Sequence, residues 1–367
     1  MRSRWAKFYY RKIQSAWSMP AKGTTGPGAQ PTAKGPEAAL KELRDMVDKG
    51  DWKQALAGLD ELQQVTPKNI ESRPIIATCH LLRARALLHM GDLTKAWAEG
   101  DRAIAIAKEA GRPAIEAEAM CAVANVHWKK GRLDKALEIL EKASAAAKLS
   151  TDERVQGIVS LEKATVHMKT QAYDDAEREY RDAILALEKV GEQRQLARAF
   201  NNFAHVFYYQ GLWEKAEEMF LKCRRLSERA GFRSIGAWAA FNRAEALLEL
   251  KRVDESRREL DWAMPILEEL GDTYGLVVTN SIYSVVHAME KDFVKADASL
   301  EKARQLNQKI DIPHMKGRLA YDQGLVCKYR GEKARAVKLF KEAKEVYAKI
   351  GSTSEVHRIE KELKELS

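Results

Sequence analysis

A turn-like mark recurs along this chain at a nearly constant interval of about 40 residues, within the range of known repeat families. The first mark reads Gly50-Asp51-Trp52 and the fifth reads Gly211-Leu212-Trp213, and in each a small residue follows five positions after the turn. The marks begin at Gly50, Gly91, Gly131, Gln171, Gly211, Lys251, Lys291 and Gly331, so the first step is one residue longer than the other six, which are equal. Self-similarity at a fixed period is the signature of a repeat architecture, in which each unit packs only on its neighbours.

Each mark lies between two stretches with helical periodicity. Apolar residues follow the i, i+3, i+4, i+7 pattern of one helix face before the fifth mark and again after it. They are Phe200, Phe203, Ala204 and Phe207, and then Trp213, Ala216, Phe220 and Cys223. A second turn is expected about halfway between marks, at Gly111, Gly191, Gly231, Gly271 and Gly351, because glycine accepts the left-handed backbone that ends a helix. The pattern predicts an all-α chain with two helices in each repeat.

These residues resemble the signature of the tetratricopeptide repeat superfamily. Its first helix carries W-x2-L-G-x2-Y and its second carries A-x3-F. Here Phe200-x2-Phe203-Ala204-x2-Phe207 and Ala216-x3-Phe220 occupy those positions. The period is longer than the usual one, as in kinesin light chains, Pins-type adaptors and the Rap regulators of bacilli. The resemblance implies a right-handed superhelical solenoid of about eight antiparallel helix pairs, closed by a C-terminal capping helix.

The repeats also divide the chain into segments. We expect a repeat domain over 37–351 and a capping helix over 352–367, where Val356, Ile359 and Leu363 share one helical side. Residues 19–36 are rich in Gly, Pro, Thr and Ala and read as a flexible linker. Residues 1–18 read as a basic amphipathic segment with Trp5, Phe8 and other apolar residues on one face.

The net charge of +9 belongs mostly to the N-terminal tail. Residues 1–35 hold seven of the 62 basic residues and no acidic ones, which leaves 55 basic against 53 acidic residues in the remainder. A nearly neutral solenoid argues against nucleic-acid binding by the repeats. Three hypotheses remain open for residues 1–18: a membrane-surface or targeting segment, a segment that folds back into the chain's own groove, or an over-extended start ahead of Met19.

Motifs that carry catalysis or hold cofactors are missing from the sequence. It contains no Walker A or G-x-G-x-x-G loop, no H-E-x-x-H pair and no G-x-S-x-G elbow, so we expect no enzyme and no cofactor. No metal is expected either: His127, His167 and His287 lie whole repeats apart and should pack between helices. Four widely spaced cysteines and no long apolar run favour a reducing compartment, the cytoplasm.

The resemblance implies that the first helices line a concave groove that binds another protein. Rings and amides on those helices suit an extended or helical peptide, because rings supply contact area and amides can bond a peptide backbone. The candidate groove residues are Asn125, Trp128, Arg198, Asn201, Asn202, His205, Tyr208, Tyr209, Trp238, Phe241, Asn242 and Glu245. An excess of cations at such positions, including Arg85, Arg318 and Lys328, suggests an acidic partner segment. The leading function is a non-catalytic scaffold or adaptor. The alternative is a regulatory sensor whose superhelix changes shape on binding a small peptide or metabolite.

Overall fold

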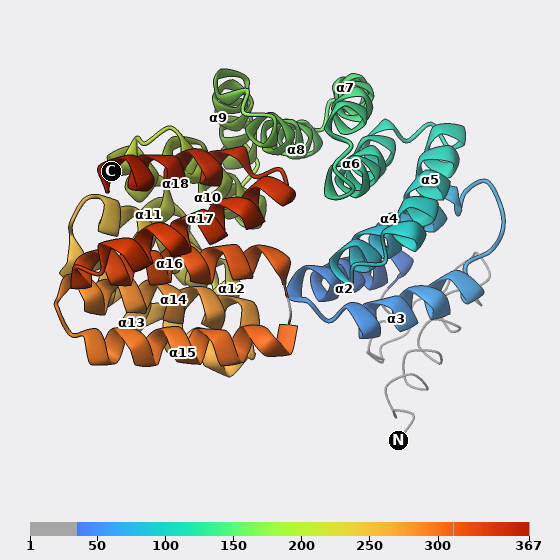
Figure 1. Cartoon of the computed structure of the whole chain (residues 1–367). Coiled ribbons are helices and arrows are strands. Elements are labelled where there is room, and N and C mark those ends of the chain that lie inside the picture. Colours follow the sequence, from blue (N-terminus) through green and yellow to red (C-terminus); the bar gives the residue numbers. More distant parts are fainter. Residues whose placement is uncertain (1–34, 311, 367) are drawn as a thin grey trace. The chain divides into compact units, whose positions relative to one another are not determined.

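The computed structural model describes residues 35–310 and 312–366. The hypotheses for residues 1–18, and for all but the end of the linker at 19–36, therefore lie outside the described residues. Over the described part the chain is all-α, without strands, and its helices follow one another in antiparallel pairs (Figure 1). They are α2 (Pro36–Lys49), α3 (Trp52–Val65), α4 (Arg73–His89), α5 (Leu93–Glu109), α6 (Pro113–Lys129), α7 (Leu133–Ser150), α8 (Glu153–Lys169), α9 (Tyr173–Lys189), α10 (Gln193–Tyr209), α11 (Trp213–Ala230), α12 (Arg233–Glu249), α13 (Val253–Leu270), α14 (Thr273–Met289), α15 (Phe293–Ile310), α16 (Pro313–Arg330), α17 (Lys333–Lys349) and α18 (Thr353–Glu365). The predicted solenoid of eight helix pairs followed by one further helix is confirmed.

Every predicted mark is a left-handed turn, including the three that lack glycine. Gln171, Lys251 and Lys291 have φ of 62°, 59° and 65°, in the same left-handed region as the glycines at the other marks. In each case the backbone N–H of the residue after the mark bonds back into the preceding helix, as Ala172 N–H does to the His167 carbonyl at 2.9 Å. This closure satisfies a carbonyl that the helix end leaves without a partner. The period seen in the sequence therefore corresponds to a left-handed backbone conformation at the same position of every repeat.

Small residues allow the two helices of a pair to approach closely. In the pair α10–α11 these positions are held by Ala204 and Cys223, and both are fully buried. Gly324 has the same role in α16, because a Cβ there would lie 2.6 Å from the ring of Phe340. Larger side chains at these positions would force the helices apart.

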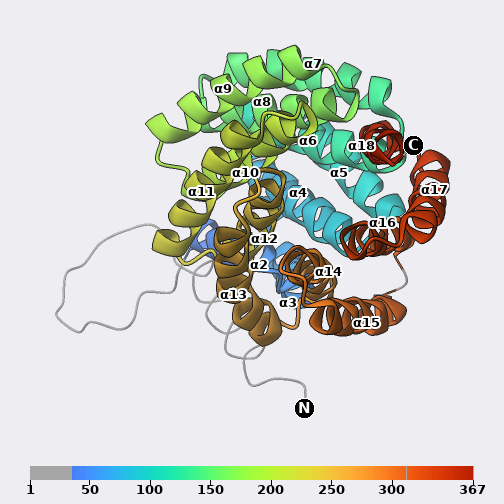
Figure 2. The same cartoon turned by 60° about the vertical axis from the view of Figure 1, so that its left-hand side comes forward.

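The described chain forms two compact units, which divide after Val190. In each unit the first helices of successive pairs pack on one another: α4, α6 and α8 in the first unit, and α10, α12, α14 and α16 in the second. Within each unit the second helix of a pair packs on its own partner and on the first helix that follows it in that unit. In Figure 2, α11, α13, α15 and α17 lie outside the row of first helices of the second unit. The first helices therefore form the inner layer of the second unit (Figure 2), and we use the same term for the row of first helices in the first unit.

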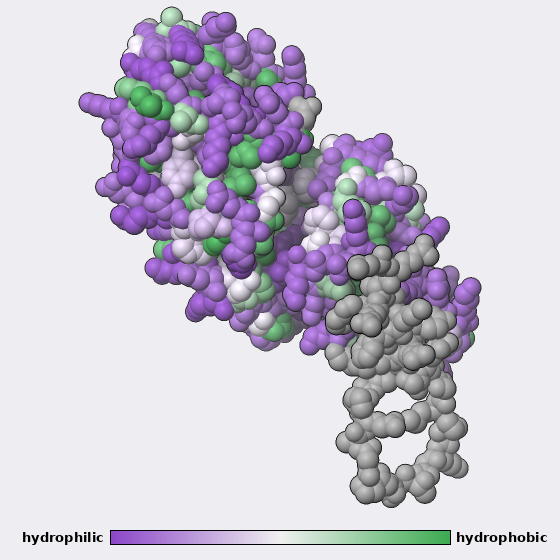
Figure 3. Space-filling model, turned by 90° about the horizontal axis from the view of Figure 1, so that it is seen from below, coloured by the Kyte–Doolittle hydropathy of each residue, from purple (hydrophilic) through white to green (hydrophobic). Residues whose placement is uncertain are grey.

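Most of the surface seen from below is polar (Figure 3). Hydrophilic residues predominate on the face seen in Figure 3, and hydrophobic residues there form only scattered areas. Over the described ranges no helix is both long and apolar enough to cross a membrane.

Candidate partner-binding face

Four of the predicted groove residues form a polar cluster between α10 and α12. The Asn242 side-chain amide donates to Asn201 Oδ1 at 3.2 Å and lies 3.3 Å from His205 Nε2. Asn201 Nδ2 in turn donates to Asn202 Oδ1 at 3.3 Å. All four side chains are only partly buried. The cluster, which we call the amide cluster, thus offers side-chain amides and an imidazole at an inner face that water reaches.

Aromatic residues flank this cluster on the same helices. The rings of His205 and Tyr209 stack with centroids 6.0 Å apart. Trp238 on α12 remains 38% exposed, and its indole N–H donates to Asp272 at 2.6 Å. The Trp238 ring lies 5.4 Å from that of Tyr274 on α14. These rings provide apolar contact area beside the amides.

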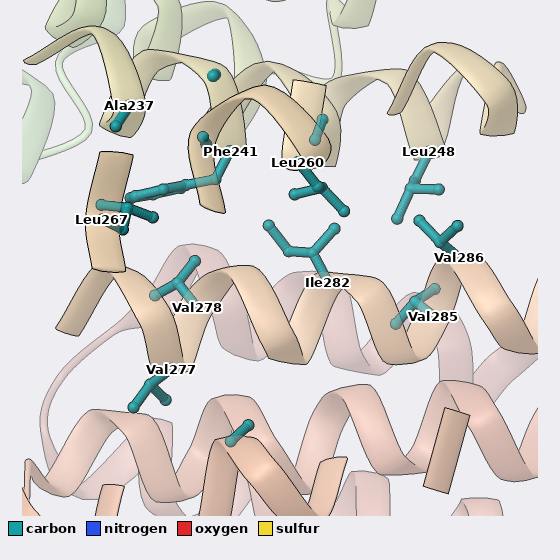
Figure 4. Close-up of a cluster of buried hydrophobic side chains, with 14 of the residues drawn as sticks. Ala237, Phe241, Leu248, Leu260, Leu267, Val277, Val278, Ile282, Val285 and Val286 are labelled. Carbon is teal, nitrogen blue, oxygen red and sulfur yellow. The ribbon is translucent and has the colours of Figure 1, made fainter. Parts of the chain in front are cut away.

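Two of the predicted groove aromatics are buried and do not face a groove. Phe241 is 3% exposed and belongs to the hydrophobic core, where Figure 4 shows its side chain among those of Leu267 and Val278. Tyr208 is 6% exposed and packs edge-on against Trp213 at 4.9 Å. The two corrections have different causes. A first helix contacts neighbours on several sides, so Phe241 is buried between repeats. Tyr208 instead lies against Trp213 and beneath the guanidinium of Arg358 on α18.

Glu245 lies in an ion-pair network instead of an open groove. Its carboxylate is 3.3 Å from the guanidinium of Arg318 on α16 and 3.0 Å from that of Arg358 on α18. Arg358 also contacts Glu249 at 2.7 Å, and Arg318 contacts Asp322 at 3.4 Å. The side chains of Glu245, Arg318 and Arg358 are 16%, 17% and 19% exposed. We call these residues, with Glu355, the Arg358 network.

The pKa values of the carboxyl groups in the Arg358 network shift in opposite directions. Burial opposes the ionisation of Glu245, but Arg318 and Arg358 outweigh it and lower its pKa to about 2. Burial raises the pKa of Asp322, which Arg318 and a hydrogen bond from Ser281 only partly offset. Burial likewise raises the pKa of Glu355. Between its two arginines Glu245 therefore ionises more readily than a free glutamate, whereas Asp322 and Glu355 ionise less readily than free carboxyls.

Arg358 is the site residue that sequence reasoning missed. It comes from the last helix, yet it contacts α12 and its guanidinium lies 5.4 Å from the Tyr208 ring centroid on α10. A signal was present, because Arg358 falls one repeat period after Arg318 and four periods after Arg198. The capping helix thus continues the series of first helices and covers part of the predicted groove.

Asn125 and Trp128 lie in the first unit, on α6. The Trp128 indole N–H donates to Asn125 Oδ1 at 2.7 Å, and the Lys129 ammonium lies 5.4 Å from the Trp128 ring centroid. Nearby on the inner layer, buried Glu118 is paired with Arg154 and lies 3.8 Å from Arg44. Burial raises the pKa of Glu118, but Arg154, Arg44 and Arg85 act against it, and the net direction is downward.

Several cations that suggested an acidic partner already have acidic neighbours. Arg85 contacts Asp48 at 2.9 Å, and Lys328 contacts both Glu362 and Glu365 at 2.7 Å. Arg198 donates to Gln195 at 2.5 Å.

Among the described residues, no group of His, Cys, Asp and Glu side chains could hold a metal ion. The four cysteines, which are all buried, are free thiols.

Comparison with known proteins agrees with this architecture. Family models described as tetratricopeptide repeat match residues 75–149, 157–229 and 195–269, and a second such model matches residues 121–190. No curated protein matches the sequence.

Solved structures resemble the chain over most of its length. The apo form of RapI covers 90% of this chain and 97% of its own at a TM-score of 0.62 and 15% identity. A Rap protein in complex with competence and sporulation factor covers 90% and 99%, at a TM-score of 0.60 and 14% identity. The apo quorum sensor NprR from B. thuringiensis covers 90% and 98%, at 0.59 and 15%. At such identities the likeness concerns the fold.

Proposed function

This chain belongs to the tetratricopeptide repeat family, and we propose that it is a non-catalytic scaffold or adaptor that binds a peptide or helix of another protein on its inner layer of first helices. The observation that carries the proposal is the amide cluster of Asn201, Asn202, His205 and Asn242 between α10 and α12. Side-chain amides can both donate to and accept from a peptide backbone, so they hold an extended segment without demanding one sequence. Tyr209 and the exposed Trp238 supply apolar contacts beside it.

Charge suggests where an acidic partner segment would bind. In the second unit such a segment would have to displace Glu245 from two arginines. In the first unit three arginines, Arg44, Arg85 and Arg154, lie near Glu118, and even with Asp48 beside Arg85 the cations outnumber these two acids. We therefore place an acidic preference on the inner layer of the first unit. Four free, buried thiols fit a reducing compartment, and we propose the cytoplasm.

The test compares two double variants of the full chain. Peptides are first selected from a displayed random library on the wild-type protein, and their affinities are measured by fluorescence anisotropy. Asn201→Ala with Asn242→Ala removes the hydrogen bonds of the amide cluster and should weaken binding about tenfold, since each bond contributes on the order of 1 kcal/mol. Gln305→Ala with Gln308→Ala removes two exposed amides from the outer helix α15 and should change nothing. Unchanged affinity in the first variant would contradict the proposed face.

A second candidate, a ligand sensor, is favoured by the Arg358 network. Arg358 joins α18 to Glu245 and Glu249 on α12, which lie 113 and 109 positions earlier in the chain. A ligand that competes for these carboxylates would release α18 and change the shape of the second unit. Solution scattering with a selected peptide distinguishes the two: a sensor changes its radius of gyration on binding, whereas a scaffold with a preformed face does not.

A further inference from the structure

One position on the first helices is filled by a long polar side chain in most repeats. It immediately precedes the small residue of the pair contact, and its side chain contacts a polar partner on a second helix. Arg83 contacts Asp60 at 2.7 Å, and Lys163 contacts Glu179 at 2.7 Å and Glu141 at 3.0 Å. In the second unit Arg243 pairs with Glu217 and Glu259, Tyr283 bonds to Asp261, and Gln323 accepts from Arg304, while Phe203 fills the position with a buried ring. These side chains occupy the clefts between second helices.

The corresponding residue of α6 is Val123, which is too short to cross the cleft. Its side chain turns toward α5, where Gly100 leaves room: a Cβ at Gly100 would lie 2.6 Å from Val123 Cγ2. In two other repeats the side chain at this position also contacts an acid on the second helix of its own pair: Arg83 contacts Glu99, and Arg243 contacts Glu259. The equivalent position on α7 is Ile139. Two long side chains are thus absent from one place, and a cavity of about 420 Å³ remains between α5, α6 and α7.

The cavity has an apolar wall and a cationic rim. Trp97, Ile104, Met120, Val123, Val126 and Ile139 line it, together with Asp101, His127, Lys130, Arg132, Lys135 and Lys142. Lys135 and Lys142 share one carboxylate, Glu138, at 2.7 and 2.8 Å. Lys130 and Arg132 are exposed and form no ion pair with any described residue. Trp97 is 45% exposed, which leaves much of its apolar surface toward solvent.

His127 adds a polar atom without a partner. Its Nδ1 is buried and makes no hydrogen bond within the described part of the chain. Burial, and then the charges of Arg132, Lys135 and Lys130, lower the pKa of His127 below its ordinary value. His127 is one of the residues that line the cavity, and the Nδ1 of an imidazole can donate or accept one hydrogen bond. Buried polar atoms without partners are uncommon in proteins, so a bound group that satisfies Nδ1 is favourable.

We propose that this cavity binds a small amphipathic anion, with its apolar body against Trp97 and Ile139 and its carboxylate or phosphate at Lys130 and Arg132. The volume lies within the usual range of small-molecule sites, roughly 300–1,000 Å³. An extended peptide fits less well, because Arg83 and Lys163 occupy the clefts of the neighbouring repeats and would interrupt it. The chain's own residues 1–34 carry seven cations and no acids, so their charge opposes a cationic rim.

Calorimetry on the full chain with a matched pair of probes tests the anion. Naphthoate and naphthamide have nearly the same shape, but only the first is charged. Naphthoate should bind about tenfold more tightly, since only its carboxylate pairs with the two exposed cations of the rim. Equal affinities, or no binding of naphthoate, would overturn the proposal.

Variants locate the site. Val123→Arg with Ile139→Glu recreates the ion pair that Arg243 and Glu259 form, fills the cavity and should abolish naphthoate binding while helical circular dichroism is retained. Lys130→Glu with Arg132→Glu alters only exposed side chains, so folding is not at risk, and should weaken naphthoate about tenfold without affecting naphthamide. Lys148→Glu on α7, outside the cavity lining, is the control. Naphthoate binding that survives the rim variant refutes the site.

The cavity proposal and the proposal of a peptide-binding face can be tested independently. Asn201→Ala with Asn242→Ala should leave naphthoate binding unchanged, because neither residue lines the cavity. Loss of naphthoate binding in that variant would place the probe on the inner layer and contradict the cavity assignment.

Discussion

Neutralising Glu245 isolates the contribution of the Arg358 network to stability. Glu245→Gln keeps the shape of the side chain and one acceptor oxygen but removes the charge that faces Arg318 and Arg358. The pKa of Glu245 falls from its ordinary value of 4.5 to about 2 in the folded chain. Each tenfold change in proton affinity corresponds to about 1.4 kcal/mol, so the ionised carboxylate stabilises the fold by about 3 kcal/mol at neutral pH. The 16% exposure of the side chain is too small to require a large reduction for solvent screening.

The sign of the pH dependence follows from the lowered pKa. Stability from Glu245 is fully present above its ordinary pKa of 4.5 and is lost as pH falls toward about 2. About 1 kcal/mol should remain at about pH 3. Asp322 and Glu355, whose pKa values burial raises, act in the opposite direction as pH falls. The charge of Glu245 contributes to both raised pKa values, but burial, which the substitution leaves in place, is their largest cause. The difference between wild type and variant therefore reports mainly on Glu245.

Urea unfolding followed by circular dichroism measures this difference at pH 7 and about pH 3. Glu301→Gln on the outer helix α15 is the control, because that carboxylate is 57% exposed and its pair with Arg304 should contribute less than about 1 kcal/mol. A Glu245→Gln destabilisation below about 1 kcal/mol at pH 7, or one that is the same at both pH values, would refute the reasoning.

Two further perturbations test the turns and the thiols. Lys291→Gly should raise the free energy of unfolding by up to about 1 kcal/mol, because φ there is 65° and only glycine adopts it without strain. Urea titrations measure this free energy, and no change would mean that the turn carries no strain. Burial raises the pKa of Cys79 and Cys223 to about 12, so a thiol reagent at pH 8 should modify these two in the native chain at least about a hundredfold more slowly than in urea. Fast native labelling would show that these helices open readily.

The candidate face was only partly predictable, and the failures have a common origin. Register correctly places Asn201 and Asn242 on adjacent first helices, where they meet within hydrogen-bond distance. The position of a residue within the repeat does not by itself tell whether its side chain faces the inner side or the next repeat. Phe241 and Asn201 occupy the same position of successive repeats, yet Phe241 is in the core and Asn201 is partly exposed. A large apolar side chain there is buried by the neighbouring helices.

The cavity between α5, α6 and α7 was also only partly predictable from the sequence. The exchange of an arginine or lysine for Val123, and of a glutamate for Ile139, can be read from the sequence by aligning repeats. Whether neighbouring side chains fill the resulting space cannot be read, because filling depends on rotamers and on Gly100 across the pair. Only the packed structure shows that a volume remains.

By itself the sequence determined the repeat, the helix pairs and the turns, because these depend on contacts within a single repeat and on local backbone preferences. Even the marks at Gln171, Lys251 and Lys291 could be placed without glycine, since the period identified them. Tertiary structure alone decided that Arg358 would reach Glu245, 113 residues away. A contact across that distance depends on the small rotation between successive repeats, which accumulates along the solenoid and is set by the packing of every pair.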